Sequence, residues 1–369
     1  MSPLSAIFEV RDLQVIRGGS LILNIPSLVV SDGEILVLIG PNGAGKSTLL
    51  TALSALLKPT RGEILFRGRK IGAEIPLLQY RRRLAMVLQE PLLFDTTVYN
   101  NVASGLKIRG IQGDEAEPIV NKALERFGIA RLSDRSARTL SGGEARRASI
   151  ARAFATNPEV LLLDEPFSAL DPIMRETLIE DLEQVLRETR ITTIFVTHDR
   201  MEALRLATRL GVMNAGEIHQ IGSPDEVMNH PVNEFVASLV GVENLLHGKV
   251  IKKNKGSFIA SVSGQDIDAM GLMESGDPVI LCIRPENVIL SDIVSGNPSG
   301  PRNTFPANVV RITPMGPYNK VQLNCGFPLV TYVTSHALSA LSIKQGTEVF
   351  ASFDSNAVHA IRKGPQADP

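Results

Sequence analysis

Residues 40–48 decide the fold of this chain, and they read Gly40-Pro41-Asn42-Gly43-Ala44-Gly45-Lys46-Ser47-Thr48. The spacing matches the pattern G-x-x-x-x-G-K-S, in which glycines let backbone amides turn inward around phosphate oxygens and a helix N-terminus faces the anion. We expect Lys46 to reach the β- and γ-phosphates of a nucleotide, and the Ser47 hydroxyl to bind Mg²⁺. The loop follows the apolar run 35–39 and precedes the helix-like stretch 47–57, which is the context that a phosphate-binding loop requires.

An apolar strand that ends in two acids follows later in the chain, at Leu161-Leu162-Leu163-Asp164-Glu165-Pro166. A parallel strand leaving the core at this point would deliver Asp164 to Mg²⁺ and its waters. Glu165, one residue further on, could orient or deprotonate an attacking water. Beside a phosphate-binding loop, this pair of acids predicts nucleotide hydrolysis rather than an ordinary solvated strand end.

A second turn suited to an anion reads Leu140-Ser141-Gly142-Gly143-Glu144. Exposed amides and a helix dipole at Ser141, Gly142 and Gly143 would bind a phosphate group. Because the sequence contains a single phosphate-binding loop, this second turn is best explained if it covers the nucleotide of another copy. The pattern therefore predicts a homodimer that encloses ATP between its subunits.

The hydrophobic pattern around these motifs predicts two domains. Short apolar runs between residues 6 and 30 indicate antiparallel strands, and later strands alternate with helices, as in a mostly parallel sheet covered on both faces. A stretch without strand-like runs predicts a helical subdomain at about 90–155. After residue 240, short β-like segments recur among prolines and glycines. The predicted fold is an α/β P-loop NTPase domain over 1–240, with antiparallel β and helical subdomains, followed by an all-β, OB-like barrel domain over 241–369.

Composition narrows the possible partners. The net charge is −1, so no global field directs the protein toward nucleic acid or anionic lipid, and we expect no nucleic-acid partner. Two cysteines among 369 residues are too few for a disulfide framework. The N-terminal residues do not have the pattern of a signal peptide, and no apolar run approaches the roughly 20 residues that cross a bilayer. If the protein serves a membrane, we expect it to lie on the surface.

Across residues 6–240 the chain resembles the ATP-binding subunits of ABC transporters, because its motifs occur in the order typical of that family. Besides the three motifs above, the matching elements are Gln89 in Leu88-Gln89-Glu90-Pro91, the segment Ser168-Ala169-Leu170-Asp171, and His198 in Val196-Thr197-His198-Asp199. The resemblance implies an ATPase that uses ATP and Mg²⁺. It further implies that Gln89 senses Mg²⁺ and the water, and that His198 contacts the γ-phosphate.

The same resemblance implies partners and a location. The apolar segment Pro91–Val102 would form the groove that receives a short helix of the transmembrane permease subunits. A substrate-binding protein would take part indirectly, and the chain would lie peripherally on the cytoplasmic face of the plasma (inner) membrane. Relatives stack the adenine on an aromatic residue shortly before the phosphate-binding loop. Here the matching stretch, residues 13–19, has no aromatic residue. Arg17 is the best substitute, because a guanidinium plane can stack on a base.

Two stretches of the C-terminal part, ENLLHGKV at 243–250 and IRPENV at 283–288, match landmarks of the TOBE-like tandem β-barrel domain of importer ATPases, which this part resembles. Its second half, 302–361, is most similar to the oxyanion-binding barrels of molybdate and tungstate systems. The resemblance implies that hydroxyls in Thr331-Tyr332-Val333-Thr334-Ser335, together with backbone amides, would hold the dianion. However, Asp354 stands where those barrels often carry Lys, and a carboxylate opposes the binding of a dianion. We therefore expect an importer ATPase for molybdate, tungstate or a related oxyanion, with importers of polyamines, sugars or ferric ion as the alternative. An ABC ATPase that acts on nucleic acid or the ribosome is the alternative of a different class.

Overall fold

The computed structural model describes residues 5–292 and 303–363. The chain divides after Pro224 into two compact units, 1–224 and 225–369. This division lies earlier than the boundary expected at residue 240, because two short helices, α8 (Pro224–Asn229) and α9 (Glu234–Leu239), fall almost entirely within the second unit.

The first unit begins with a four-stranded antiparallel sheet in the order β2-β1-β4-β5. Its strands are β1 (Ala6–Arg17), β2 (Ser20–Ser31), β4 (Arg61–Phe66) and β5 (Arg69–Lys70). Phe8 of β1 is fully buried and pairs with Val30 on one side and Phe66 on the other. The predicted antiparallel subdomain before and after the phosphate-binding loop is confirmed.

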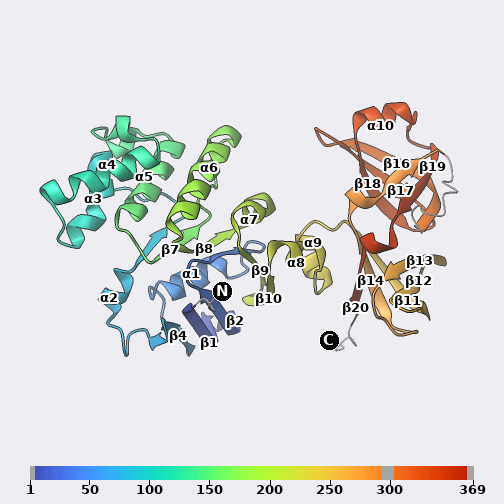
Figure 1. Ribbon diagram of the computed structural model, residues 1–369, viewed down its shortest axis with the longest axis horizontal. Helices are drawn as coiled ribbons and strands as arrows, with labels where there is room; N and C mark the ends of the chain where they lie inside the picture. Colours follow the sequence, from blue (N-terminus) through green and yellow to red (C-terminus); the bar gives the residue numbers. More distant parts are fainter. Residues whose placement is uncertain (1–4, 293–302, 364–369) are drawn as a thin grey trace. The chain divides into compact units, whose positions relative to one another are not determined.

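The central sheet of the first unit has six strands in the order β10-β9-β3-β8-β7-β6. They are β3 (Ile35–Ile39), β6 (Leu84–Val87), β7 (Val160–Asp164), β8 (Thr192–Thr197), β9 (Arg209–Asn214) and β10 (Glu217–Gly222). Neighbouring strands are parallel except β9 with β10. Strands β7 and β8 are buried throughout, as expected for a sheet covered on both faces. Because β8 lies between β3 and β7, the loops that follow these three strands meet at one end of the sheet (Figure 1).

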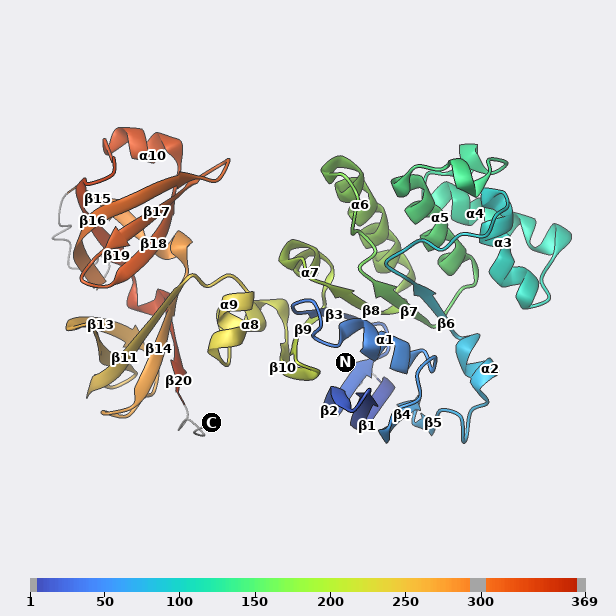
Figure 2. The same ribbon diagram turned by 180° about the vertical axis from the view of Figure 1, so that it is seen from behind.

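Helices cover this sheet and form a separate group beside it. The helices near the sheet are α1 (Lys46–Leu53), α2 (Leu77–Arg81), α6 (Pro172–Thr189) and α7 (Arg200–Leu206). The group contains α3 (Val98–Ile108), α4 (Glu117–Arg126) and α5 (Gly142–Ala155), which lie together in both views (Figures 1 and 2). Thr97 caps α3, and Ser141 and Glu144 form a capping box at the start of α5. No helix among the described residues is long and apolar enough to span a bilayer.

The second unit contains two five-stranded antiparallel sheets, in the orders β13-β12-β11-β14-β20 and β15-β19-β16-β17-β18. The first comprises β11 (Asn244–Lys253), β12 (Ser257–Val262), β13 (Gln265–Met270), β14 (Pro278–Ile283) and β20 (Val358–Arg362). The second comprises β15 (Ile289–Ser291), β16 (Asn303–Pro314), β17 (Asn319–Asn324), β18 (Pro328–Val333) and β19 (Glu348–Phe353). The predicted all-β, barrel-like C-terminal part is confirmed.

Two buried asparagines join these sheets through side-chain amides that imitate strand pairing. Asn244 donates to the carbonyl oxygen of Val330 at 2.9 Å and accepts from its amide at 2.6 Å. Asn303 exchanges the same pair of hydrogen bonds with the backbone of Asp268, at 2.8 and 2.9 Å. Both sheets contribute to one hydrophobic cluster, so they share a core.

Candidate functional site

The loops after β3, β6, β7 and β8 line a cavity of about 910 Å³. Most of its walls come from segments that carry the sequence motifs, although those segments are far apart in the chain. The lining residues are Ile22, Asn42, Gly43, Ala44, Gly45, Lys46, Ser47, Thr48, Gln89, Glu90, Glu165, Ser168, Ala169 and His198. The parallel order β3-β8-β7 is what brings these residues together.

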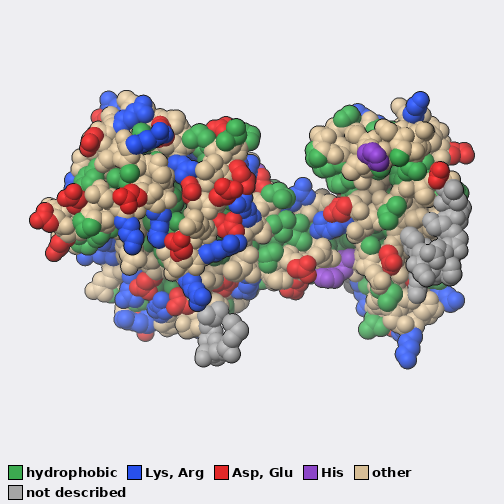
Figure 3. Space-filling model, turned by 45° about the horizontal axis from the view of Figure 1, so that its top comes forward, with side chains coloured by type: hydrophobic (Ala, Val, Ile, Leu, Met, Phe, Trp, Pro, Cys, Tyr) green, Lys and Arg blue, Asp and Glu red, His purple; other side chains and the backbone are tan. Residues whose placement is uncertain are grey.

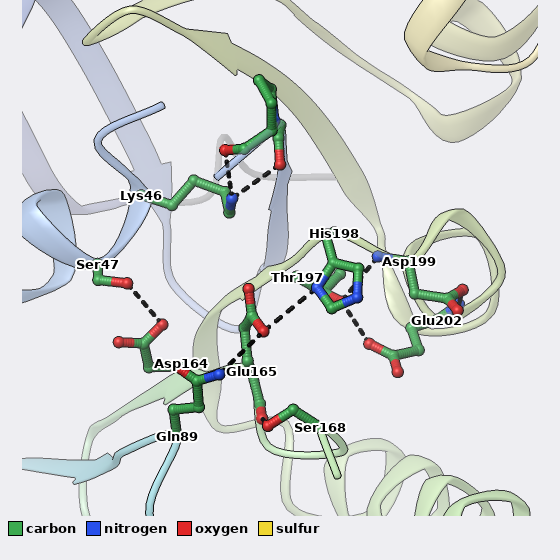
Figure 4. Close-up of polar contacts among 12 residues, drawn as sticks. Lys46, Ser47, Gln89, Asp164, Glu165, Ser168, Thr197, His198, Asp199 and Glu202 are labelled. Carbon is green, nitrogen blue, oxygen red and sulfur yellow. Dashed lines mark hydrogen bonds and ion pairs between the residues drawn. The ribbon is translucent and has the colours of Figure 1, made fainter. Parts of the chain in front are cut away.

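Lys46 is the only lysine of the phosphate-binding loop, and its ammonium group is held by the loop itself. Its Nζ donates to the carbonyl oxygens of Gly40 at 2.8 Å and Pro41 at 3.0 Å (Figure 4). Burial lowers the pKa of Lys46, while the nearby Glu165 and Asp164 carboxylates oppose this shift. Carbonyl oxygens carry only partial charges, so this cation is well suited to exchange them for phosphate oxygens.

Two glycines of the same loop are required by close backbone contacts. A Cβ atom on Gly40 would lie 2.2 Å from the carbonyl oxygen of Met213 in β9, which is far inside contact distance. Gly45 has a φ of +96°, and a Cβ there would lie 2.7 Å from the Leu23 side chain. The loop therefore follows its path directly above the sheet because these positions have no side chain.

Ser47 and Asp164 meet where α1 begins and β7 ends. The Ser47 hydroxyl donates to Asp164 Oδ1 at 2.9 Å (Figure 4). Asp164 is only 8% exposed, and burial raises its pKa. Among the described residues no cluster of three or more His, Cys, Asp or Glu side chains could hold a metal ion. One hydroxyl and one carboxylate are nevertheless a donor set that suits Mg²⁺, which usually takes its other ligands from phosphates and water.

Glu165 lies at the centre of the polar contacts drawn in Figure 4. Its Oε2 atom is 3.2 Å from His198 Nδ1 and makes a long contact of 3.5 Å with Gln89 Nε2. The backbone of Glu165 has a φ of +44°, which is unusual for a residue with a side chain. Its amide donates to the Val196 carbonyl at 3.0 Å, and its carbonyl accepts from the Ser168 hydroxyl at 2.9 Å. These bonds hold the carboxylate at the cavity wall in a backbone conformation that would otherwise be disfavoured.

The segment around Gln89 is anchored by two arginines of α5 that the sequence analysis did not identify. Arg146 is 3% exposed and donates to the carbonyl oxygens of Leu88, at 2.6 Å, and Gln89. Arg152 donates to the Leu92 carbonyl at 3.0 Å, and its guanidinium lies 5.8 Å from the ring centre of Phe94. No motif pattern marks such contacts, because they depend on how α5 packs beside this segment.

Not every predicted site residue lies at the cavity. Arg17 is exposed at the turn between β1 and β2 and is not a lining residue, whereas Ile22 of β2 is. Ser141, Gly142 and Gly143 also do not line the cavity; they begin α5, where the Ser141 hydroxyl and amide both contact the Glu144 carboxylate.

The surface of the first unit carries both kinds of charge. On the face shown in Figure 3, basic and acidic side chains are interspersed, and no large area has a single sign. Within the segment 91–102, Leu92 is 60% and Phe94 57% exposed, while Val98 and Val102 are fully buried. The segment thus contributes to the subdomain core and also presents apolar side chains to the exterior.

Comparison with known protein families gives two matches. The ABC transporter family matches residues 23–168, and the TOBE domain family matches residues 281–361.

Curated relatives align along nearly the whole chain. The molybdate/tungstate import ATP-binding protein of Pyrococcus horikoshii is 37% identical over 337 residues, which cover 91% of this chain and 94% of that protein. The trehalose/maltose import ATP-binding protein of Thermococcus litoralis is 36% identical, with coverage of 91% and 92%. The sulfate/thiosulfate import ATP-binding protein of Nitrosomonas europaea is 36% identical, with coverage of 85% for both chains.

A solved structure also resembles this chain. It is cbiO1 from Clostridium perfringens, described as part of an ABC transporter complex. The alignment has a TM-score of 0.57 and 31% identity, and it covers 65% of this chain and 96% of that chain.

Proposed function

This chain belongs to the ATP-binding subunits of ABC transporters, and we propose that it energises the import of molybdate, tungstate or a related oxyanion. Membership of the family makes it an ATPase coupled to solute import. The single observation that carries the hydrolytic part of the proposal is that residues from the loops after β3, β6, β7 and β8 surround one cavity. The solute is proposed from the relatives, whose names include molybdate/tungstate, maltose and sulfate import.

In this proposal the loop 40–48 holds the triphosphate of ATP. The backbone amides of residues 42–48 face the phosphates, and the start of α1 adds its positive dipole end. Lys46 exchanges the Gly40 and Pro41 carbonyls for oxygens of the β- and γ-phosphates. Ile22 offers an apolar contact near the nucleotide, and Arg17 would stack on the base only if the β1–β2 turn moves toward it.

Hydrolysis depends on the carboxylates after β7. Ser47, Asp164 and Gln89 would hold Mg²⁺, which supplies positive charge beside the phosphate oxygens. Glu165 accepts a proton from the attacking water, because its carboxylate lies at the cavity wall. His198 stays beside Glu165 and donates toward the γ-phosphate oxygens.

Two interfaces follow from the same proposal. Ser141, Gly142 and Gly143 cover the nucleotide of a second copy, since they begin a helix and lie outside their own subunit's cavity. The exposed side chains of Leu92 and Phe94 receive a helix of the permease, which would keep the chain at the cytoplasmic face of the membrane. A substrate-binding protein would deliver the solute to the permease without contacting this chain.

The C-terminal unit does not strengthen the choice of an oxyanion. The Thr331 hydroxyl donates to the Val288 carbonyl at 2.6 Å, Thr334 caps a short helix, and the Ser335 hydroxyl accepts from Asn319. Asp354 caps a turn and accepts from the Asn356 amide. The hydroxyls expected to hold a dianion thus already make internal hydrogen bonds. Import of a sugar or polyamine therefore stays as the second candidate, favoured by relatives whose sequence identity to this chain is similar, at 36% and 38%.

The substitution Glu165→Gln tests the hydrolytic part. Loss of a general base lowers kcat by about 10²–10⁴-fold, while the amide keeps the size of the side chain and ATP still binds. Gel filtration with ATP and Mg²⁺ should show a stable dimer of the variant. Glu115→Gln, an exposed Glu→Gln change away from the cavity, is the matched control and should keep the parental rate. A normal kcat for Glu165→Gln would exclude Glu165 as the base.

The solute requires a separate experiment in cells. Cells that lack this chain are compared with the parent strain for accumulation of molybdenum and tungsten, measured by mass spectrometry, and for uptake of labelled maltose and spermidine. Loss of metal accumulation alone supports the oxyanion. Loss of maltose or spermidine uptake with normal metal accumulation would exclude it.

A further inference from the structure

Arg175 of α6 connects two segments that reach the nucleotide cavity. Its Nε atom is 3.0 Å from Glu202 Oε1, and its Nη2 atom is 2.5 Å from both Glu202 Oε1 and Asp199 Oδ2. Asp199 and Glu202 lie at the start of α7, directly after His198. One guanidinium therefore binds two carboxylates of the segment that carries His198.

The two neighbours of His198 are fixed within this network. On one side, the Thr197 hydroxyl contacts Glu202 Oε2 at 2.5 Å and accepts from the Asp199 amide at 3.0 Å. On the other side, Asp199 Oδ1 accepts from the Met201 amide at 2.7 Å and the Glu202 amide at 3.2 Å, which caps α7. Figure 4 shows Thr197, Asp199 and Glu202 around the backbone from which the His198 ring projects toward Glu165.

The His198 ring has little else to orient it. Its side chain is 60% exposed, and its ion-pair contact is with Glu165 at 3.2 Å. The direction of the ring therefore follows from the backbone of residues 197–199. That backbone in turn depends on Arg175, because the Glu202 side chain is only 5% exposed and, without Arg175, would keep the Thr197 hydroxyl as a partner but lose its cation.

Arg175 lies in the first turn of α6, just after a segment that reaches the cavity wall. Ser168 and Ala169 line the cavity, and Asp171 caps α6 by accepting from the amides of Ile173 and Met174. The Arg175 amide donates to the Asp171 carbonyl at 2.9 Å, in the first turn of that helix. The start of α6, which directly follows the wall residues Ser168 and Ala169, is thus joined to the His198 segment through the Arg175 side chain.

We propose that Arg175 is a positioning residue that holds His198 against Glu165 and couples it to the segment 168–171 that leads into α6. The inference rests on the proposed role of His198 in ATP hydrolysis. Arg175 does not line the cavity, whereas its guanidinium binds Asp199 and Glu202 beside His198, so its effect on hydrolysis passes through His198.

A double-mutant cycle on the full chain tests this inference. Arg175→Ala should lower the kcat for ATP about tenfold or more and leave KM within about twofold, since the phosphate-binding loop is untouched. His198→Ala should lower kcat at least as much. The double variant should equal His198→Ala alone, because a residue that acts through His198 has no effect once the imidazole is gone.

Arg205→Ala is the matched control. Arg205 lies on α7 and pairs with Glu176 and Glu183 of α6, so it joins the same two helices with a side chain of similar exposure, 31% against 34%. It does not contact the His198 segment through any of these bonds. The control should keep the parental kcat; an equal loss in both arginine variants would show a general loosening of α6 and α7 and would overturn the inference.

Further outcomes are decisive. Parental kcat in Arg175→Ala, or a loss that multiplies with that of His198→Ala, overturns the inference while leaving the role of His198 intact. Parental kcat in His198→Ala overturns the proposed role of His198 and the inference with it. If Arg175→Ala does not fold, Arg175→Ala combined with Glu202→Gln removes the unpaired buried charge. This variant should fold and still show the loss, and full activity would contradict the inference.

Discussion

The substitution Gly40→Ala tests whether the phosphate-binding loop depends on direct contact with β9. The new Cβ would lie 2.2 Å from the Met213 carbonyl oxygen and 3.2 Å from the Ala44 Cβ. Carbon and carbonyl oxygen normally stay about 3.3 Å apart, so the loop or the strand must shift by about 1 Å. Met213 is fully buried within the hydrophobic cluster of the first unit, so a shift of this strand disturbs packed neighbours. Overpacking of this kind costs about 1–3 kcal/mol.

The same shift affects function, because the Gly40 carbonyl accepts from Lys46. A displacement of about 1 Å at a reacting group can lower the rate about 10²-fold. We expect the melting temperature to fall by about 2–12 °C, with a large loss of ATP affinity in calorimetry. Gly68→Ala is the control: Gly68 has a φ of +73° and no atom within 4 Å, so only backbone strain is added. If Gly40→Ala behaved like this control in both measurements, the steric reasoning would be wrong.

Two further predictions concern charge at the proposed ATP interfaces. Burial raises the pKa of Asp164 above its ordinary value of 3.8, so the ionised carboxylate is disfavoured in the folded state and folding stability declines as the pH rises through that raised pKa. Asp164→Asn should therefore have a higher melting temperature than the parent at pH 7, and the two melting temperatures should converge as the pH approaches 3.8. The variant should also lose the stabilisation that ATP with Mg²⁺ provides. A lower melting temperature of the variant at pH 7 would contradict this reasoning. The Ser141 amide holds the pKa of Glu144 below its usual value, so Glu144 is an anion beside the turn proposed to cover the partner's phosphates. At a separation of roughly 10 Å in water each pair of unit charges costs about 0.4 kcal/mol, so Glu144→Gln should tighten ATP-driven dimerisation about twofold to fivefold in sedimentation experiments, less so at high salt. An unchanged or weaker dimer at low salt would argue against the proposed interface.

The fold was predictable because its main signals are local in the sequence. The apolar run 35–39, the glycine-rich loop and the helix after it form one strand–loop–helix unit, and the strands at β7 and β8 are uninterrupted apolar segments. The antiparallel sheet and the C-terminal all-β part were also predicted from short alternating runs. Strand order was not readable in this way, yet it is the order β3-β8-β7 that brings the motifs to one cavity.

Contacts at the site that depend on tertiary packing could not be predicted. The positive φ of Glu165 is held by bonds to Val196 and Ser168; both residues lie in recognisable motifs, but the bonds themselves have no sequence signature. Arg146 looks like any surface arginine of a helix in the sequence, but it is buried against the carbonyls of Leu88 and Gln89. The contacts of its guanidinium depend on the packing of α5 beside the Gln89 segment, which the sequence does not specify.

The two arginine networks explain how a few motif residues can act together across the cavity. Arg146 ties the helix that begins at Ser141 to the Gln89 segment, and Arg175 ties the wall at 168–171 to the His198 segment. In each case a guanidinium bridges two backbone segments that the strand order brings close but does not itself connect. Because Gln89 and His198 both contact Oε2 of Glu165, a movement at either network changes the surroundings of the same carboxylate oxygen. In the proposed dimer, coupling between closure and hydrolysis would therefore meet at Glu165.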